Sequence, residues 1–221
     1  MKKIYILIGI AIFLALLGAS PFALRYFSEK KVEEAFRATY GSHKDFDRIY
    51  SVIHENKALI AQKPDNDSAY DSLAQGYYVL GALDQARDAM LKATELKGDY
   101  DAYWSRLGKI YQAKKEYPLA ATAYQKALRV NPKKKDHYKN LAWLYYFRFD
   151  GADHLKAFPI LQSGLQSLPK DKDLLFDITR YYLYDNNVKE FLKYVPQYLA
   201  VNPQDSAMKK DYEKMKKIMN K

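Results

Sequence analysis

Residues 101–134 read DAYWSRLGKIYQAKKEYPLAATAYQKALRVNPKK, and this stretch decides the fold. Apolar and small residues from Trp104 to Tyr111 keep the i, i+3, i+4, i+7 spacing that places them on one face of a helix. A second stripe of the same kind runs from Ala120 to Ala127. Small residues let two antiparallel helices approach closely, and aromatic rings fill the gaps beside them. The stretch therefore predicts a helical hairpin.

The same pattern recurs along the chain with a period of 34 residues. The positions of Trp104 and Tyr111, for example, are held one period earlier by Tyr70 and Tyr77. The third occurrence carries a three-residue insertion near Gly151, and the fourth is the weakest. Because one hairpin cannot bury its own apolar face, we expect the units to stack into a solenoid. The predicted units are residues 67–100, 101–134, 135–171 and 172–205.

This pattern resembles that of the tetratricopeptide repeat family. The family places a bulky residue, Leu-Gly or Leu-Ala and then Tyr in its first helix, and Ala, an aromatic or Leu, a second Ala and a closing Pro in its second. Residues 101–134 match at every one of these positions, ending in Asn131-Pro132. The resemblance covers about 140 of the 221 residues. It implies an all-α solenoid that serves as a binding platform, although the fold alone does not name the partner.

The first residues predict a single transmembrane helix. After Met1-Lys2-Lys3, residues 4–24 carry no charge, and about 20 apolar residues span the hydrocarbon core of a bilayer. We expect an anchor over residues 1–25; the alternative is a cleaved signal peptide with its cleavage site near Gly18-Ala19-Ser20. Basic residues lie on both sides of the span, so the positive-inside rule does not fix its orientation. We expect a bacterial inner membrane protein whose soluble domain faces the extracytoplasmic, periplasmic side.

Two further helical segments flank the repeats. Residues 26–66 predict a connector or N-terminal cap: a helix up to Thr39, a break at Gly41 and a second helix that begins at Ser42. Residues 206–221 predict a basic capping helix with a stripe of Met and Tyr and an opposite face of Lys. Capping is the usual role of such a helix in a solenoid. The alternative is a basic surface for anionic lipid or an acidic partner.

Composition narrows the classes of function. The formal net charge is +10, and the chain contains 21 Tyr. The apolar content of 48% excludes an intrinsically disordered chain. The absence of Cys excludes disulfide scaffolds and metal sites with Cys ligands. The four His form no i, i+4 pair, and no nucleophile or phosphate-binding motif is present. We therefore expect no catalytic residue, no metal and no cofactor. Because the Lys residues are dispersed and belong to no nucleic-acid-binding motif, we also expect no nucleic-acid partner.

The candidate binding site comes from the resemblance. In proteins similar to this one, five positions on the first helix of each repeat line a groove. Those positions hold an unusual number of aromatic and basic side chains here, which favours a peptide or helix that carries a carboxylate. The alternative is that the last two units bury these rings themselves. The chaperone-binding clamp of the family is not reproduced, since Asp71 and Gln75 replace its first Lys and Asn. The candidate groove residues are Tyr78, Lys109, Gln112, Lys139, Trp143, Tyr146, Phe147, Phe176, Arg180 and Tyr184.

These inferences predict a membrane-tethered protein–protein interaction scaffold, an adaptor or assembly factor, that holds a partner segment in its groove. Short anchored proteins of this kind resemble bacterial assembly factors for envelope complexes, including those of cytochrome c maturation. Its partners would then be membrane or envelope proteins, with lipid contacted through the N-terminal helix, and self-association stays open. The alternative is a structural accessory subunit, built permanently into a larger membrane complex through its convex face and caps.

Overall fold

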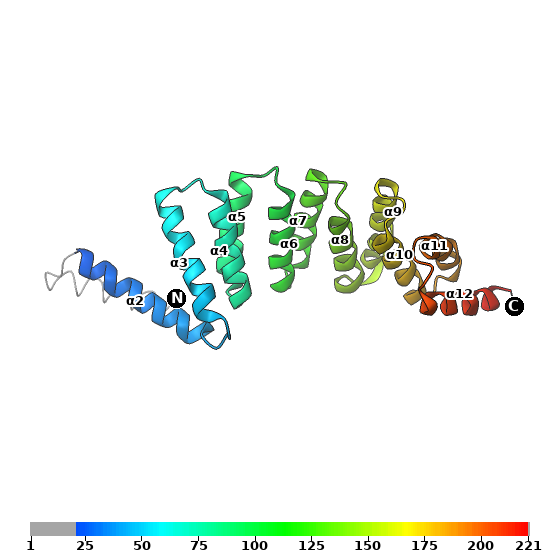
Figure 1. Cartoon of the computed structure of the whole chain (residues 1–221), viewed down its shortest axis with the longest axis horizontal. Coiled ribbons are helices and arrows are strands. Elements are labelled where there is room, and N and C mark those ends of the chain that lie inside the picture. Colours follow the sequence, from blue (N-terminus) through cyan, green and yellow to red (C-terminus); the bar gives the residue numbers. More distant parts are fainter. Residues whose placement is uncertain (1–20, 221) are drawn as a thin grey trace.

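The computed structural model describes residues 21–220, and every regular element within them is a helix (Figure 1). The all-α prediction is confirmed for this part of the chain. The elements are α2 (Pro21–Tyr40), α3 (Phe46–Gln62), α4 (Asp67–Leu80), α5 (Leu83–Leu96), α6 (Asp101–Ala113), α7 (Tyr117–Val130), α8 (Lys135–Arg148), the 3-10 helix η1 (Gly151–Lys156), α9 (Ala157–Ser167), α10 (Lys172–Tyr184), α11 (Val188–Val201) and α12 (Ser206–Met219).

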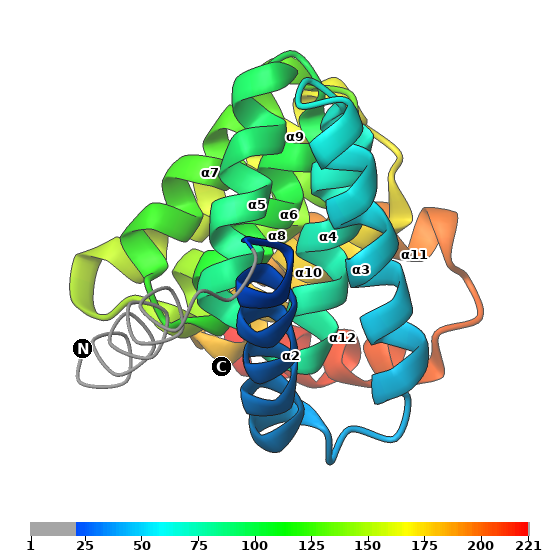
Figure 2. The same ribbon diagram turned by 90° about the vertical axis from the view of Figure 1, so that its left-hand side faces the viewer.

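Four helical hairpins form a row: α4 with α5, α6 with α7, α8 with α9 and α10 with α11 (Figure 1). Helix α3 packs on α4 at one end of the row, and α12 packs on α11 at the other. Figure 2 looks along the row from its N-terminal end and shows that successive hairpins are rotated relative to one another. The architecture is the predicted solenoid, in which each hairpin is supported by its neighbours.

Small residues bring the two helices of a hairpin together, as the sequence predicts. Ala86, Ala120 and Ala127 are completely buried. A Cβ atom placed on Gly108 would lie 2.5 Å from the ring of Tyr124, which is itself buried. Helices α6 and α7 therefore pack so closely at Gly108 that no larger residue fits without moving that ring.

Polar contacts join the start of one hairpin to the start of the next along the row. The hydroxyl of Tyr103 donates to Asp67 at 2.7 Å, and one repeat later Nε2 of His137 lies 2.7 Å from Asp101. In each pair the first helix of one unit contacts the first helix of the unit before it. These contacts set the spacing between α4, α6 and α8, whose exposed faces form the candidate site.

The turns between paired helices each contain one residue with positive φ: Gly81, Lys115, Gly151 and Asn186. Three of them occupy the same position in their units, whereas Gly151 comes later because η1 is inserted before α9. Helix α9 thus begins late, at Ala157, and Pro159 lies in its first turn, where proline is tolerated. Helix α11 continues through Pro196 instead of ending there.

The N-terminal segment differs in one detail from expectation. The second connector helix begins at Phe46 with Asp45 as its N-cap, and not at Ser42, because residues 41–45 form a turn. The predicted anchor, residues 1–25, lies almost wholly outside the described residues. Within residues 21–220, no helix is both long and apolar enough to span a bilayer.

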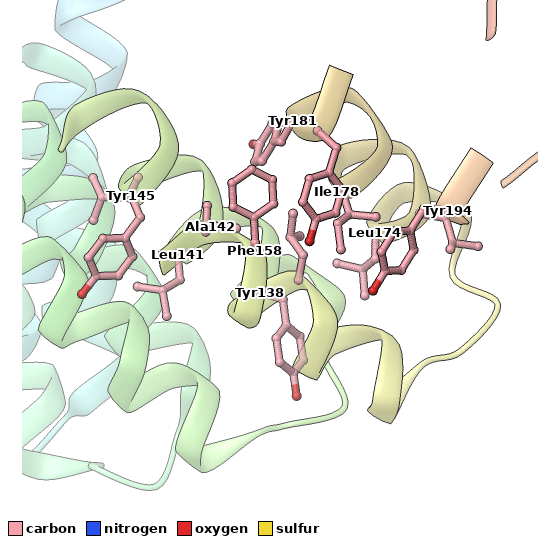
Figure 3. Close-up of a cluster of buried hydrophobic side chains, with 14 of the residues drawn as sticks. Tyr138, Leu141, Ala142, Tyr145, Phe158, Leu174, Ile178, Tyr181 and Tyr194 are labelled. Carbon is pink, nitrogen blue, oxygen red and sulfur yellow. The ribbon is translucent and has the colours of Figure 1, made fainter. Parts of the chain in front are cut away.

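The buried core consists of two clusters. One extends from α3 to Ala123 of α7, and the other extends from α7 to α12; Tyr111 packs against both. Figure 3 shows part of the second cluster, in which rings such as Tyr138 and Tyr194 lie among aliphatic side chains of α8 and α10. The repeated tyrosines Tyr77, Tyr145 and Tyr182 are buried, so this repeated position is part of the core.

Candidate functional site

The ten predicted groove residues lie on the first helices of the hairpins, on α4, α6, α8 and α10. We call the surface formed by these four helices the groove. The structure divides it into two parts with different environments. The open half comprises the parts of α4, α6, α7 and α8 that line two hollows, including Arg148 at the end of α8. The closed half comprises Lys139, Tyr146 and Phe147 of α8 together with η1 and α10.

The open half begins with an apolar hollow of about 200 Å³ between α4 and α6. Its walls include Val79 and Ile110, and the fully buried Met90 closes its floor. Tyr78 and Val79 are 40% and 51% exposed, so apolar surface is available to a ligand. Gln75, Arg106 and Lys109 supply the polar rim.

A second, larger hollow of about 620 Å³ adjoins the first and shares Tyr78 and Lys109 with it. It extends over α6 to α8, where Trp143 forms part of its wall. The guanidinium of Arg148 lies 5.0 Å from the centre of the Trp143 ring. A cation over the face of an indole is attracted by its π electrons, which holds Arg148 against the wall. Four predicted residues, Tyr78, Lys109, Gln112 and Trp143, are thus brought together in the two hollows.

In the closed half, Tyr146 is held by contacts within the protein. Its ring stacks on that of Tyr181 with centroids 4.1 Å apart, and its hydroxyl donates to Asp185 at 2.7 Å. Phe147 packs edge-on against the same Tyr181 ring at 5.7 Å. Burial, followed by the hydrogen bond to Asp185, raises the pKa of Tyr146. The hydroxyl therefore stays protonated and acts as a donor.

The inserted helix η1 adds His154 to this cluster. Nε2 of His154 lies 3.1 Å from Asp185, and Nδ1 lies 2.9 Å from the carbonyl oxygen of Gly151. Both ring nitrogens thus face oxygen acceptors, and only the protonated imidazole can donate to both. The hydrogen bond to Gly151 and then that to Asp185 raise the pKa of His154. The His154 ring also packs edge-on against Tyr146 at 5.6 Å.

The other predicted residues of the closed half also have partners within the chain. Lys139 lies 3.8 Å from Asp177, while Arg180 donates to the hydroxyl of Tyr184 at 2.6 Å and lies 3.8 Å from Asp211 of α12. Phe176 is 39% exposed and packs against Tyr198 of α11 at 5.6 Å.

Asp177 is the most strongly shifted carboxyl group of the closed half. Burial raises its pKa to about 6, and the attraction of Lys139 only partly opposes that effect. Asp71, at the other end of the groove, is similar: burial raises its pKa, although Arg106 lies 2.9 Å away. Acidic groups therefore lie on both sides of the open half.

The sequence reasoning missed several residues of the second hollow. Lys115 lies in the turn between α6 and α7, and Arg148 is the last residue of α8. Tyr117 and Tyr124 come from α7, and Asn140 lies on α8 outside the five family positions. The family pattern places groove residues only on the exposed face of each first helix, so it carries no signal for residues of the turns or of the second helix. Among the residues that the structure describes, no group of three or more His, Cys, Asp or Glu could hold a metal ion.

Comparisons with known proteins agree with this architecture. Residues 102–134 match the family model for the tetratricopeptide repeat. The chain is 32% identical over 111 residues to the Hsp70-Hsp90 organizing protein 3 of Arabidopsis thaliana. That match covers 50% of this chain but only 20% of the relative, so the chain spans about a fifth of the relative's length.

Two solved structures have the same fold at low sequence identity. MamA has a TM-score of 0.60 at 22% identity, over 77% of this chain and 95% of MamA. YrrB, described as a TPR protein with an unusual peptide-binding site, has a TM-score of 0.56 at 18% identity, over 75% of this chain and 84% of YrrB. Residues 102–134 thus form a tetratricopeptide repeat, set in a helical solenoid that has the fold of solved tetratricopeptide-repeat proteins.

Proposed function

We propose that this protein is a membrane-tethered interaction scaffold, an adaptor or assembly factor, that binds a peptide or helix of a partner protein in its groove. The observation that carries the proposal is the pair of adjoining hollows in the open half, where Tyr78, Lys109 and Trp143 are accessible on one surface. A concave, partly apolar surface with a few polar groups is the usual form of a ligand site. The named roles of the organizing protein and of YrrB, chaperone organisation and peptide binding, point to the same class of function.

The membrane part of the proposal rests on residues 1–25 of the sequence. An anchor there would place the solenoid at the bacterial inner membrane, with its soluble domain on the extracytoplasmic side. Confinement to one membrane raises the effective concentration of a membrane partner, so that a modest affinity of the groove suffices. An assembly factor for an envelope complex fits this arrangement.

A second candidate function is a structural subunit that uses its C-terminal cap instead of the groove. Helix α12 favours it, because Ile218 and Met219 are more than half exposed and Lys209, Lys210, Lys214 and Lys217 form no ion pair within the described part of the chain. Such a subunit would be recovered with its complex in fixed stoichiometry.

Affinity capture of the full-length protein from gently solubilised native membranes tests the proposal. Trp143→Ala should remove the partner, because truncating a central aromatic residue typically costs an interface 2 kcal/mol or more, roughly a thirtyfold loss of affinity. Leu119→Ala, at an exposed apolar residue of α7 outside the hollows, is the matched control and should retain it. Tyr146 is unsuitable as a probe since it supports the closed half. A partner that survives Trp143→Ala and is lost on substituting the α12 lysines would establish the second candidate instead.

A further inference from the structure

The second hollow of the open half concentrates positive charge. Its lining contains three cations, Lys109, Lys115 and Arg148, and no carboxylate. Within the described residues, none of the three side chains forms an ion pair or a hydrogen bond with another side chain. By contrast, Arg106, Lys139 and Arg180 on the same groove each lie within 4.0 Å of an aspartate. The hollow is therefore a local concentration of unneutralised charge on the groove surface.

Two of these cations are restrained by their surroundings. Arg148 is held over the Trp143 ring. Lys115 has φ of 63°, a conformation that the turn requires and that L residues rarely adopt. Its neighbour Lys114 is bound by Asp84 and Glu116, which fixes the backbone on which Lys115 is carried. Three like charges gathered on one surface repel one another, and a bound anion relieves that repulsion.

The first hollow has a different chemistry. Its lining is mainly apolar, with Gln75, Arg106 and Lys109 at the rim, and its volume of about 200 Å³ accommodates about one apolar side chain. The two hollows adjoin at Tyr78 and Lys109. A ligand that fills both must therefore present an apolar side chain next to negative charge.

We infer that the open half binds an acidic segment of a partner protein, in which an apolar side chain enters the first hollow while neighbouring Asp or Glu carboxylates contact Lys109, Lys115 and Arg148. This inference rests on the proposed function and names its ligand class. The positive region is short, because the groove carries Asp71 on one side of it and Asp177 and Asp185 on the other. A few carboxylates match that extent, whereas a long nucleic acid would find no further run of free cations, because Arg106, Lys139 and Arg180 lie next to aspartates.

Selection from a library of random displayed peptides, with the full-length protein held in detergent micelles, tests the inference. The enriched peptides should carry Leu, Ile or Phe next to Asp or Glu. The double variant Lys109→Ala/Arg148→Ala should bind the best synthetic peptide about tenfold more weakly, since each exposed charge pair contributes a fewfold. Lys170→Ala/Lys189→Ala removes two exposed lysines outside the hollows and should leave the affinity unchanged. Replacing Glu by Gln in the peptide should reproduce the loss seen with the double variant.

The other outcomes separate the inference from the proposed function. Enriched peptides that lack acidic residues, yet lose binding to Trp143→Ala, would leave the groove as a peptide site and overturn the acidic ligand class. The inference would also be overturned if the protein bound single-stranded oligothymidylate more tightly than any peptide and the Lys109→Ala/Arg148→Ala variant lost that binding. If no peptide is enriched and capture of the membrane partner is unaffected by Trp143→Ala, both the inference and the proposed function fail.

Discussion

The two halves of the groove are built from equivalent helices, yet only in the open half do the predicted residues line hollows instead of contacting the next repeat. In the open half, Tyr78 and Trp143 line hollows. In the closed half, Tyr146 stacks on Tyr181 and donates to Asp185. The difference arises from η1, which carries His154 against Asp185, and from the acidic residues that α10 and its following turn supply. An aromatic residue at a groove position is therefore a candidate for ligand binding only where it does not hold the next repeat in place.

The largest expected effect comes from the close approach beneath the open half. Gly108→Ala places a methyl group 2.5 Å from the Tyr124 ring, and overpacking a buried contact of this kind should cost about 2 to 3 kcal/mol of stability. Because Tyr124 also lines the second hollow, partner binding should weaken as well. Gly98→Ala is the control, since its Cβ would meet only the Thr94 carbonyl at 3.3 Å. Urea denaturation of both variants measures the difference, and equal stabilities would contradict the packing described for α6 and α7.

A pair of tyrosine truncations sharpens the comparison of the two halves. Tyr146→Ala should lower the stability by about 2 kcal/mol, because it removes an aromatic stack and a hydrogen bond to a carboxylate. Tyr78→Ala should change stability by about 0.5 kcal/mol or less and should instead weaken partner binding, since its ring lines both hollows. Thermal unfolding and partner capture on both variants give the two readouts. The reverse pattern would mean that the open and closed halves have been assigned the wrong way round.

The half-buried Asp177 gives the closed half a pH dependence. Its pKa of about 6 in the folded protein exceeds the ordinary value of 3.8, so the folded state binds the proton more tightly. Its contribution to stability is then complete below pH 3.8 and is lost as the pH rises through 6. Asp177→Asn should remove that loss and make the protein about 1 kcal/mol more stable at pH 7.5. Asp65→Asn, at an exposed site, is the control and should leave the stability at pH 7.5 unchanged. Denaturation at pH 5 and pH 7.5 checks this; a variant less stable at both values would show that the pair with Lys139 outweighs burial.

The smallest effect concerns His154. Its pKa is raised by the Gly151 carbonyl and by Asp185, so its stabilising contribution is complete below its ordinary pKa of 6.5 and is lost as the pH rises through the folded value. Because the His154 ring is close to solvent, we expect its contribution to the free energy of unfolding to be only a few tenths of a kcal/mol. An NMR titration should give a pKa for His154 above 6.5, and Asp185→Asn should lower it. An unchanged pKa in that variant would show that η1 is not held by Asp185.

The helical hairpins could be predicted from the sequence because their packing is local. Ala86, Gly108 and Ala120 recur at fixed spacing, and only small residues allow two helices to approach so closely. The short turns between paired helices were harder to predict, since Gly81, Lys115 and Asn186 share a positive φ but not a residue type.

The availability of the groove residues could not be predicted in the same way. Lys139 and Arg180 appeared to be free cations, yet their partners Asp177 and Asp211 lie on other helices, at separations that only the stacking of repeats determines. Lys115 and Arg148 could not be predicted from the repeat pattern, because they lie at helix ends and not at the groove positions of the first helices. Which side chains are left without partners is a property of the tertiary structure.

The central claim is that the open half, and not the closed half or α12, receives the partner. Hydrogen exchange of the full-length protein, alone and saturated with the partner recovered from membranes, tests it most directly. The account predicts slower exchange in α4, α6 and the turn containing Lys115, with α10 and α12 unchanged. Protection confined to α10 and α12, with α4 and α6 exchanging as in the free protein, would contradict it.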